Sequence, residues 1–306
     1  PEPNNQIDYN SKIVLLGSCF SEHIGDKLNY FKFQSTQNPF GVLFHPVAIE
    51  NLITDGINKK EFKEADLFLQ NDIWSCFDAH SRLSNPSKET VLENLNRAVN
   101  DLHKGINEAT HVFVSLGTAW CYRYIESDKI VANCHKVPQK KFLKELLTVE
   151  AIAESIEAMI RLIRSINNEV VIIFTLSPVR HLKDGFIENQ RSKAHLLSAI
   201  HEVVDPRSRV HYFPSYEIMM DELRDYRFYS EDMIHPGKLA IDHIWDKFSY
   251  TWIDSEVTAT MKEVASIQQG LEHRPYHPES LRHKEFIRDL KDRQEQLSST
   301  FPHIVF

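Results

Sequence analysis

The segment KIVLLGSCFSEHIG, which runs from Lys12 to Gly25, decides the fold of this chain. It opens with a run of apolar and β-branched residues, which is typical of a buried strand, and the run breaks at Gly17. Over residues 19–28 the apolar residues recur at the spacing of an amphipathic helix. The segment therefore predicts a strand, a tight turn and a helix, with Ser18 and Cys19 in the turn.

Two interpretations of this turn stay open from the segment alone. Its side chains lie at the carboxyl end of a strand and at the N-terminus of a helix, where free N–H groups and the helix dipole favour developing negative charge. Ser18 or Cys19 can act there as a nucleophile. Alternatively, Ser18 only caps the helix and Cys19 is a small buried hydrophobic residue.

The composition is that of a globular protein. The chain has 306 residues, of which 42% are hydrophobic and 25% are charged, and no apolar stretch approaches the roughly 18 residues of a membrane span. The net charge is −8 without a long basic run, so nucleic acid is not an expected partner. The four cysteines show no CxxC spacing, which favours a reducing compartment and hence the cytoplasm. Because the sequence begins at Pro1 rather than Met, a processed or trimmed terminus leaves export open.

Buried strands and amphipathic helices alternate along most of the chain. Apolar strands are predicted at residues 110–118, 169–179 and 209–219, a shorter one at 31–35, and a hairpin at 119–137 that turns at Ser127 and Asp128. Residues 68–80 read as an irregular insertion with strand character. Amphipathic helices are predicted from about residue 46 and at residues 88–106, 148–166 and 188–204. This alternation predicts an α/β fold with a mainly parallel sheet of five strands, covered on both faces.

The last part of the chain is predicted to be helical. We expect one domain over residues 1–253 and a helical C-terminal extension over residues 254–306 that packs on it. The final helix, from about 278 to 297, is highly charged but keeps apolar residues, among them Leu281 and Leu290. It is therefore expected to pack on its own domain or to form a homo-oligomer contact.

A second chemical signal lies near residue 235. Asp232 precedes His235 by three residues at the start of a predicted helix, a spacing at which the carboxylate can fix the imidazole tautomer and stabilise its charged form. A capping aspartate with a surface histidine is the alternative. A nucleophile in the first turn of the same α/β chain favours the catalytic interpretation.

Six short motifs occur in order along the chain: GSCF, NPFG, LGTAW, ANCHK, SPVRH and DMIHPG. Together they resemble the GSCFA family, a distant relative of the SGNH/GDSL hydrolases, over about residues 11–286. The resemblance implies an SGNH-hydrolase-like, flavodoxin-like three-layer α/β/α sandwich with its active site at the carboxyl ends of the strands. The activity of the GSCFA family itself is undefined.

The resemblance also implies roles for individual residues. Placing the Gly-Asp-Ser motif of the superfamily on residues 17–19 without a gap puts Cys19 at the nucleophile position, and a thiol near a helix N-terminus and an imidazole is expected to have a lowered pKa. A shift by one residue leaves Ser18 as the alternative. Asp232 and His235 match the Asp-x-x-His motif without departure.

The oxyanion hole of the superfamily is matched only in part. Gly41 of NPFG fits its glycine, whereas Gly117 and the residues after it lack the expected asparagine. Thr118, Asn133 or His135 can supply the missing donor, or they are turn and hairpin residues bonded to backbone. Arg180 and His181 follow an apolar strand and are therefore expected at the active-site edge, where they can orient a substrate carboxylate or sugar hydroxyl, or make a structural salt bridge.

Two function classes follow. The first is an esterase (deacetylase) or acyltransferase that acts on O-acyl groups, on a small molecule or a carbohydrate, through a covalent acyl-enzyme. The second is a catalytically inactive, SGNH-like protein that binds carbohydrate or another ligand. Neither a credible metal-binding spacing nor a phosphate- or dinucleotide-binding glycine motif is found, so no metal or cofactor is expected.

Overall fold

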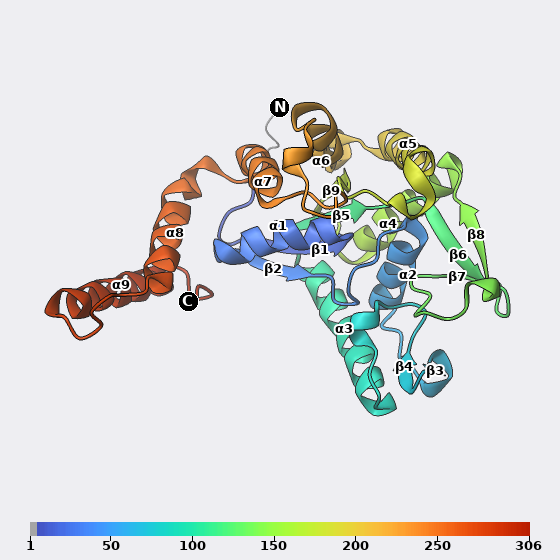
Figure 1. Cartoon of the computed structure of the whole chain (residues 1–306), viewed down its shortest axis with the longest axis horizontal. Helices are drawn as coiled ribbons and strands as arrows, with labels where there is room; N and C mark the ends of the chain where they lie inside the picture. The colour runs from blue at the N-terminus through green and yellow to red at the C-terminus, as the bar shows by residue number, and fades with distance from the viewer. Residues whose placement is uncertain (1–4) are drawn as a thin grey trace.

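A computed structural model describes residues 5–306, and residues 1–4 of the expected first domain lie outside the described residues. Its centre is a parallel sheet of five strands in the spatial order β10-β9-β5-β1-β2 (Figure 1). The strands are β1 (Lys12–Gly17), β2 (Gln34–Gln37), β5 (His111–Leu116), β9 (Val171–Leu176) and β10 (Val210–Phe213). Counted along the chain, this is the 2-1-3-4-5 order of flavodoxin-like folds, so the α/β expectation is confirmed.

Alternating side chains of β1 explain the three layers. Ile13 and Leu15 pack into a cluster with α1 (Cys19–Tyr30) and α7 (Lys238–Trp252). Val14 and Leu16 point to the other face, which is covered by α2 (Pro46–Ile57), α3 (Lys88–Glu108), α4 (Val149–Ile166) and α5 (Gly185–Val203). Because both faces are buried, the strand is apolar at every inward position, as the sequence indicates.

Two small antiparallel sheets lie outside the central one. The insertion forms β3 (Phe68–Gln70) and β4 (Ile73–Ser75), and the expected hairpin is confirmed as β6 (Trp120–Tyr124) and β7 (Lys129–Val131). A third strand, β8 (Phe142–Leu146), pairs with β6 and was not expected from the sequence.

The strand expected over residues 209–219 was too long. The strand β10 ends at Phe213, and Pro214, which lacks an N–H, precedes the short helix α6 (Ser215–Glu217) and a π-helix over Ile218–Glu222. The short strand expected at residues 31–35 is found three residues later, as β2.

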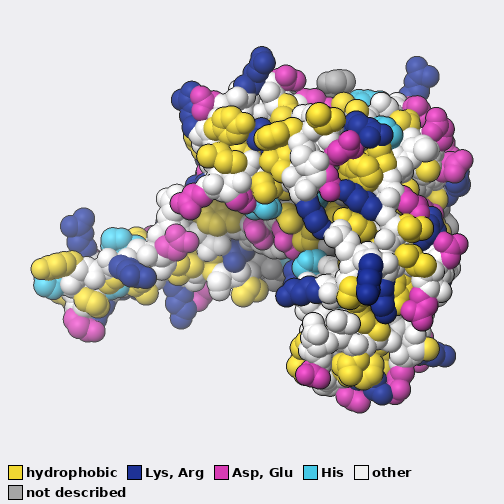
Figure 2. Space-filling view, turned by 45° about the vertical axis from the view of Figure 1, so that its right-hand side comes forward, with side chains coloured by type: hydrophobic (Ala, Val, Ile, Leu, Met, Phe, Trp, Pro, Cys, Tyr) yellow, Lys and Arg dark blue, Asp and Glu magenta, His cyan; other side chains and the backbone are white. Residues whose placement is uncertain are grey.

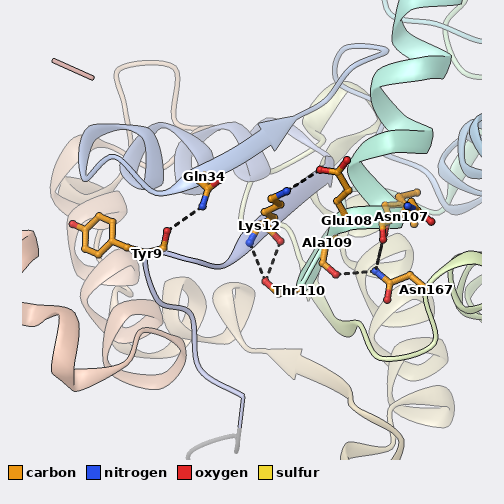
Figure 3. A network of polar contacts seen from close by, with 9 residues as sticks. Tyr9, Lys12, Gln34, Asn107, Glu108, Ala109, Thr110 and Asn167 are labelled. Carbon is orange, nitrogen blue, oxygen red and sulfur yellow. Dashed lines mark hydrogen bonds and ion pairs between the residues drawn. The ribbon is translucent and has the colours of Figure 1, made fainter. Parts of the chain in front are cut away.

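A polar network closes the amino edge of the sheet (Figure 3). The N–H of Lys12 donates to Oγ1 of Thr110 at 3.1 Å, and its ammonium group lies 2.8 Å from the carboxylate of Glu108. The amide of Asn167 donates to the carbonyl oxygens of Ile106 and Ala109, both at 2.8 Å. These contacts fix the end of α3 against the starts of β1 and β5, at the sheet edge opposite to the candidate site.

The chain ends in two helices, α8 (Thr258–Glu272) and α9 (Leu281–Thr300), which extend from the body as an arm (Figures 1 and 2). Leu290 of α9 is 2% exposed and packs against Gly270 of α8, so the two helices of the arm pack on one another. Ile304 returns to the cluster around α1 and α7, whereas Leu281 at the outer end is 81% exposed. None of the helices in residues 5–306 combines the length and apolar character that crossing a membrane requires.

Candidate functional site

The candidate residues lie at the carboxyl edge of the central sheet. The turn after β1 carries Ser18 and Cys19, next to the end of β5. The segment before α7 reaches the same edge, because the N–H of Arg180, just beyond β9, donates to the carbonyl oxygen of Ile234 at 3.2 Å. In a sheet of this strand order, β1 and β5 flank the point at which the strand order reverses. Ligands of such folds bind at this point.

The turn after β1 is held tightly. Gly17 has φ +118°, and a Cβ at this position would lie 2.1 Å from the carbonyl oxygen of Ser115, so only glycine fits. The N–H of Gly17 donates to Oδ1 of Asn38, whose amide donates to Oγ of Ser21 in α1. Asn38 of the NPFG motif therefore positions the turn, a role that spacing in the sequence does not indicate.

Ser18 is the N-cap of α1. Its Oγ accepts a hydrogen bond from the N–H of Phe20 at 3.2 Å and lies 2.7 Å from Oγ of Ser115. The residue is only 2% exposed. Its hydroxyl is thus engaged in holding the helix start and the neighbouring strand.

Cys19 is the first residue of α1 and is partly exposed. Burial raises the pKa of its thiol, the charge of Glu22 raises it further, and the N–H of Cys19 itself lowers it. The expected lowering of this pKa is therefore wrong: desolvation and a carboxylate one turn along the helix outweigh the helix N-terminus. A Cys19 nucleophile needs a general base.

Asp232 and His235 form a close pair. Nδ1 of His235 lies 2.6 Å from Oδ2 of Asp232, and the side chains are 40% and 46% exposed. The other carboxylate oxygen accepts the N–H groups of Ile234 and His235. Hydrogen bonds from the backbone and then the side chain of His235 lower the pKa of Asp232 to about 2. The carboxylate therefore holds the imidazole with Nδ1 protonated, which leaves Nε2 as the basic nitrogen.

His235 and residues of α1 beyond its first turn line one groove. His23, one helical turn beyond Cys19, lines this groove together with His235, Ser230 and Ile241. Burial lowers the pKa of His23, and the charge of His235 contributes in the same direction. No hydrogen bond joins Cys19 to His235 in the described part of the chain, where the ring of His235 is bonded to Asp232.

Three of the expected oxyanion donors are engaged elsewhere. The N–H of Gly41 donates to the carbonyl oxygen of Asn38 at 2.8 Å. The hydroxyl of Thr118 lies 2.9 Å from Oγ of Ser192 and accepts the N–H of Trp120. Nε2 of His135 lies 2.7 and 3.0 Å from the carbonyl oxygens of Cys76 and Ala79. The ring of His135 therefore binds the end of the insertion over residues 68–80.

Asn133 and Arg180 have separate surroundings. The side-chain oxygen of Asn133 accepts the N–H of His135 at 2.8 Å, while the residue itself lines a pocket. The guanidinium of Arg180 lies over the ring of Tyr229, with 4.1 Å to its centroid. Arg180 thereby supports the segment that carries His235, instead of pointing a free charge into the pocket.

A pocket of about 440 Å³ lies between the end of β5 and the β6–β7–β8 sheet. Aromatic rings form much of its lining, and polar groups include Thr118, Asn133 and His181. The aromatic residues are Phe44, Trp120, Tyr122 and Phe142. Of the two residues expected at this edge after β9, His181 lines the pocket and Arg180 does not; Lys183 and Asp184 line it as well.

Lys193 of α5 is a residue that the sequence did not indicate. It is 2% exposed, and its ammonium group donates to the carbonyl oxygens of Gly117 at 2.8 Å and Ser177 at 2.6 Å. Burial lowers its pKa to about 7. Lys193 thus joins the ends of β5 and β9 beneath the pocket.

Comparison with known proteins identifies the family. No curated protein matches the chain. The profile of the GSCFA family matches residues 12–248, which include every candidate residue discussed above. A second profile, described as the C-terminal domain of GSCFA domain proteins, matches residues 264–306, the region of α8 and α9. The chain is a member of the GSCFA family.

Proposed function

We propose that this protein is an acyl-transfer enzyme of SGNH/GDSL type, either an esterase or an acyltransferase, that works through a covalent acyl group on Cys19. The observation that carries the proposal is the Asp232–His235 pair at the sheet edge where α1 begins with Cys19. The 2-1-3-4-5 strand order supports the superfamily assignment.

Cys19 is the better nucleophile of the two candidates. The hydroxyl of Ser18 is buried and engaged with Phe20 and Ser115, whereas Cys19 is a partly exposed residue at the helix N-terminus. The helix dipole favours the negative charge that develops during attack.

The first half-reaction forms a thioester. As Sγ of Cys19 attacks the ester carbonyl carbon, its proton moves to Nε2 of His235, while Asp232 stabilises the imidazolium. The ester C–O bond then breaks, and His235 passes this proton to the departing alkoxide. The products at this point are a free alcohol and an acylated Cys19.

The second half-reaction releases the acyl group. His235 removes a proton from water or from an acceptor alcohol, whose oxygen attacks the thioester carbon. The C–S bond breaks and the proton returns to the sulfur of Cys19. With water the product is a carboxylic acid, and with an alcohol it is a new ester.

The pocket beside the site suggests the kind of substrate. Trp120 and Tyr122 are two residues apart on β6, so their side chains lie on the same face of the strand, and both line the pocket. Flat aromatic faces of this kind stack on the apolar faces of sugar rings. An O-acyl, and in particular an O-acetyl, carbohydrate is therefore the substrate class that we propose.

A non-catalytic role is the second candidate. The internal hydrogen bonds of Gly41 and Thr118 favour it, because they occupy groups that would otherwise bind an oxyanion. In that case the aromatic pocket still binds its ligand, but no covalent intermediate forms.

The direct test is incubation with p-nitrophenyl acetate, acid quenching at early times, and intact-mass measurement. We expect one added acetyl group, mapped by peptide mass to Cys19 and absent from Cys19→Ala. The unfolded chain, which exposes all four cysteines, controls for non-specific acetylation. If no adduct forms on the folded chain with any activated ester, the binding role replaces the enzymatic one.

A further inference from the structure

We propose that His181 donates a hydrogen bond to the carbonyl oxygen of the bound ester and so takes the place of the missing oxyanion-hole asparagine. The inference rests on the proposed acyl-transfer function. It assigns to His181 a direct contact with the substrate at the inner wall of the aromatic pocket.

The first argument is position. His181 lines the pocket, and its Nε2 lies 3.2 Å from the point where Gly117 would carry a Cβ. Gly117 is the residue after β5 at which the expected motif begins, and the position of its asparagine is occupied here by the fully buried Ala119. A larger residue at position 117 would collide with Phe44, whose Cβ is only 2.9 Å from the same point. The glycine therefore leaves room for the imidazole.

The second argument is that the ring is held but has no partner. It packs against the ring of Phe44 with 5.2 Å between centroids, and the N–H of His181 donates to Oδ1 of Asn189 at 2.9 Å. Within residues 5–306, neither ring nitrogen of His181 makes a hydrogen bond. An ordered polar group that faces a pocket without a partner is suited to bind a ligand atom.

The third argument is the charge state. Burial, followed by the nearby charges of Lys193 and His235, lowers the pKa of His181 to about 3, against a smaller opposite effect of Asp184. The imidazole is therefore neutral around pH 7, with one N–H to donate and no proton to lose to the thiolate. A neutral donor fixed before substrate binds stabilises an oxyanion without reorganisation.

Of the other expected donors, the side-chain amide of Asn133 also lines the pocket, but it is not among the groups nearest to Gly117. The N–H of Gly41, the hydroxyl of Thr118 and the ring of His135 are already engaged with the protein. The N–H of Cys19, at the start of α1, is the natural first donor to the oxyanion. His181 supplies the second.

The test compares two substitutions of one residue. His181→Gln places an amide N–H close to the position of Nε2, whereas His181→Leu fills the space without a donor. The acetylation rate of Cys19 by p-nitrophenyl acetate is measured by intact mass, together with the urea unfolding midpoint of each variant. We expect about a 100-fold loss of rate in His181→Leu and recovery of at least about tenfold in His181→Gln. His277→Leu, on the exposed arm, is the matched control and keeps the wild-type rate.

The outcomes separate the two proposals. Wild-type rates in His181→Leu overturn the role of His181 but leave the acyl-enzyme in place. Equal losses in the leucine and glutamine variants, with a lowered unfolding midpoint in both, show that the residue only supports the fold. If the wild-type chain itself forms no adduct, the proposed function fails and this inference fails with it.

Discussion

The hydroxyl oxygens of Ser18 and Ser115 lie 2.7 Å apart and join the turn after β1 to the end of β5. A second contact runs in parallel, because the N–H of Ser18 donates to the carbonyl oxygen of Ser115 at 2.9 Å. Both side chains are buried. Ser18 is therefore built into the support of the site, whereas the neighbouring Cys19 is a partly exposed residue.

Ser18→Ala is expected to destabilise the fold and to leave acylation in place. Loss of the cap on Phe20 and of the Ser115 partner should lower the free energy of unfolding by about 1–2 kcal/mol. Urea denaturation measures this cost, and the double variant with Ser115→Ala should cost less than the two single variants together. If Ser18→Ala instead abolishes the acetyl adduct and Cys19→Ala keeps it, the serine is the nucleophile.

Glu22→Gln is expected to speed up alkylation of Cys19. Burial raises the pKa of Cys19 and the charge of Glu22 raises it further, so removing that charge increases the thiolate fraction near pH 8. Iodoacetamide labelling with peptide mass analysis measures the rate at each cysteine. Asp26→Asn, one turn further along α1 and exposed, is the control and should change nothing. An unchanged rate in Glu22→Gln would mean that burial alone sets the pKa.

Cys19 itself should be the most reactive of the four cysteines. Burial raises the pKa of Cys76 and of Cys121 to about 12 and that of Cys134 to about 11. His235→Ala should slow alkylation of Cys19 by about tenfold or more, because the base that accepts its proton is lost. Asp232→Asn should slow it less, since the imidazole remains but is oriented poorly. Equal reactivity of wild type and His235→Ala would separate the histidine from the thiol.

The elements that could be predicted from the sequence are those set by local patterns. The runs around Val14, Val112 and Ile172 are apolar because both sheet faces are covered, and these runs predict β1, β5 and β9 directly. The Asp232–His235 contact was predictable as well, since three residues separate the partners. In contrast, β8 is an edge strand with mixed exposure whose pairing with β6 depends on the tertiary fold.

The donors around the site could not be predicted for a related reason. The sequence leaves open whether Thr118 and His135 are free donors or are bonded to backbone, and only tertiary contacts show that they and Gly41 are engaged. Conversely, the sequence places His181 at the same sheet edge as Arg180 but does not indicate which of the two enters the pocket. Its position over Gly117 results from the packing of three segments that are far apart in the chain.

Asn167→Ala tests the network at the amino edge. The amide of Asn167 donates to two carbonyl oxygens at the end of α3, and these would lose their partner. We expect a loss of about 1–3 kcal/mol in the free energy of unfolding, measured by urea denaturation. Asn167→Asp, which keeps the size of the side chain but not its N–H donors, should lose at least as much. The acetylation rate should not change, because the network lies at the sheet edge opposite to Cys19.

Lys193→Met should change how stability depends on pH. Burial lowers the pKa of Lys193 to about 7, whereas the unfolded side chain titrates at about 10.5. Between these values the unfolded state binds one more proton than the folded state, so this residue makes stability rise with pH, by up to about 1.4 kcal/mol per pH unit. Below pH 7 Lys193 is protonated in both the folded and the unfolded state, so the full cost of burying its charge lowers the stability of the fold.

The measurement compares the unfolding free energies of wild type and Lys193→Met in urea from pH 6 to 10, and their difference should increase with pH. The corresponding difference for the exposed Lys104→Met should not change with pH. Parallel curves for wild type and Lys193→Met would mean that the two carbonyl oxygens of Gly117 and Ser177 keep the ammonium charged inside the fold.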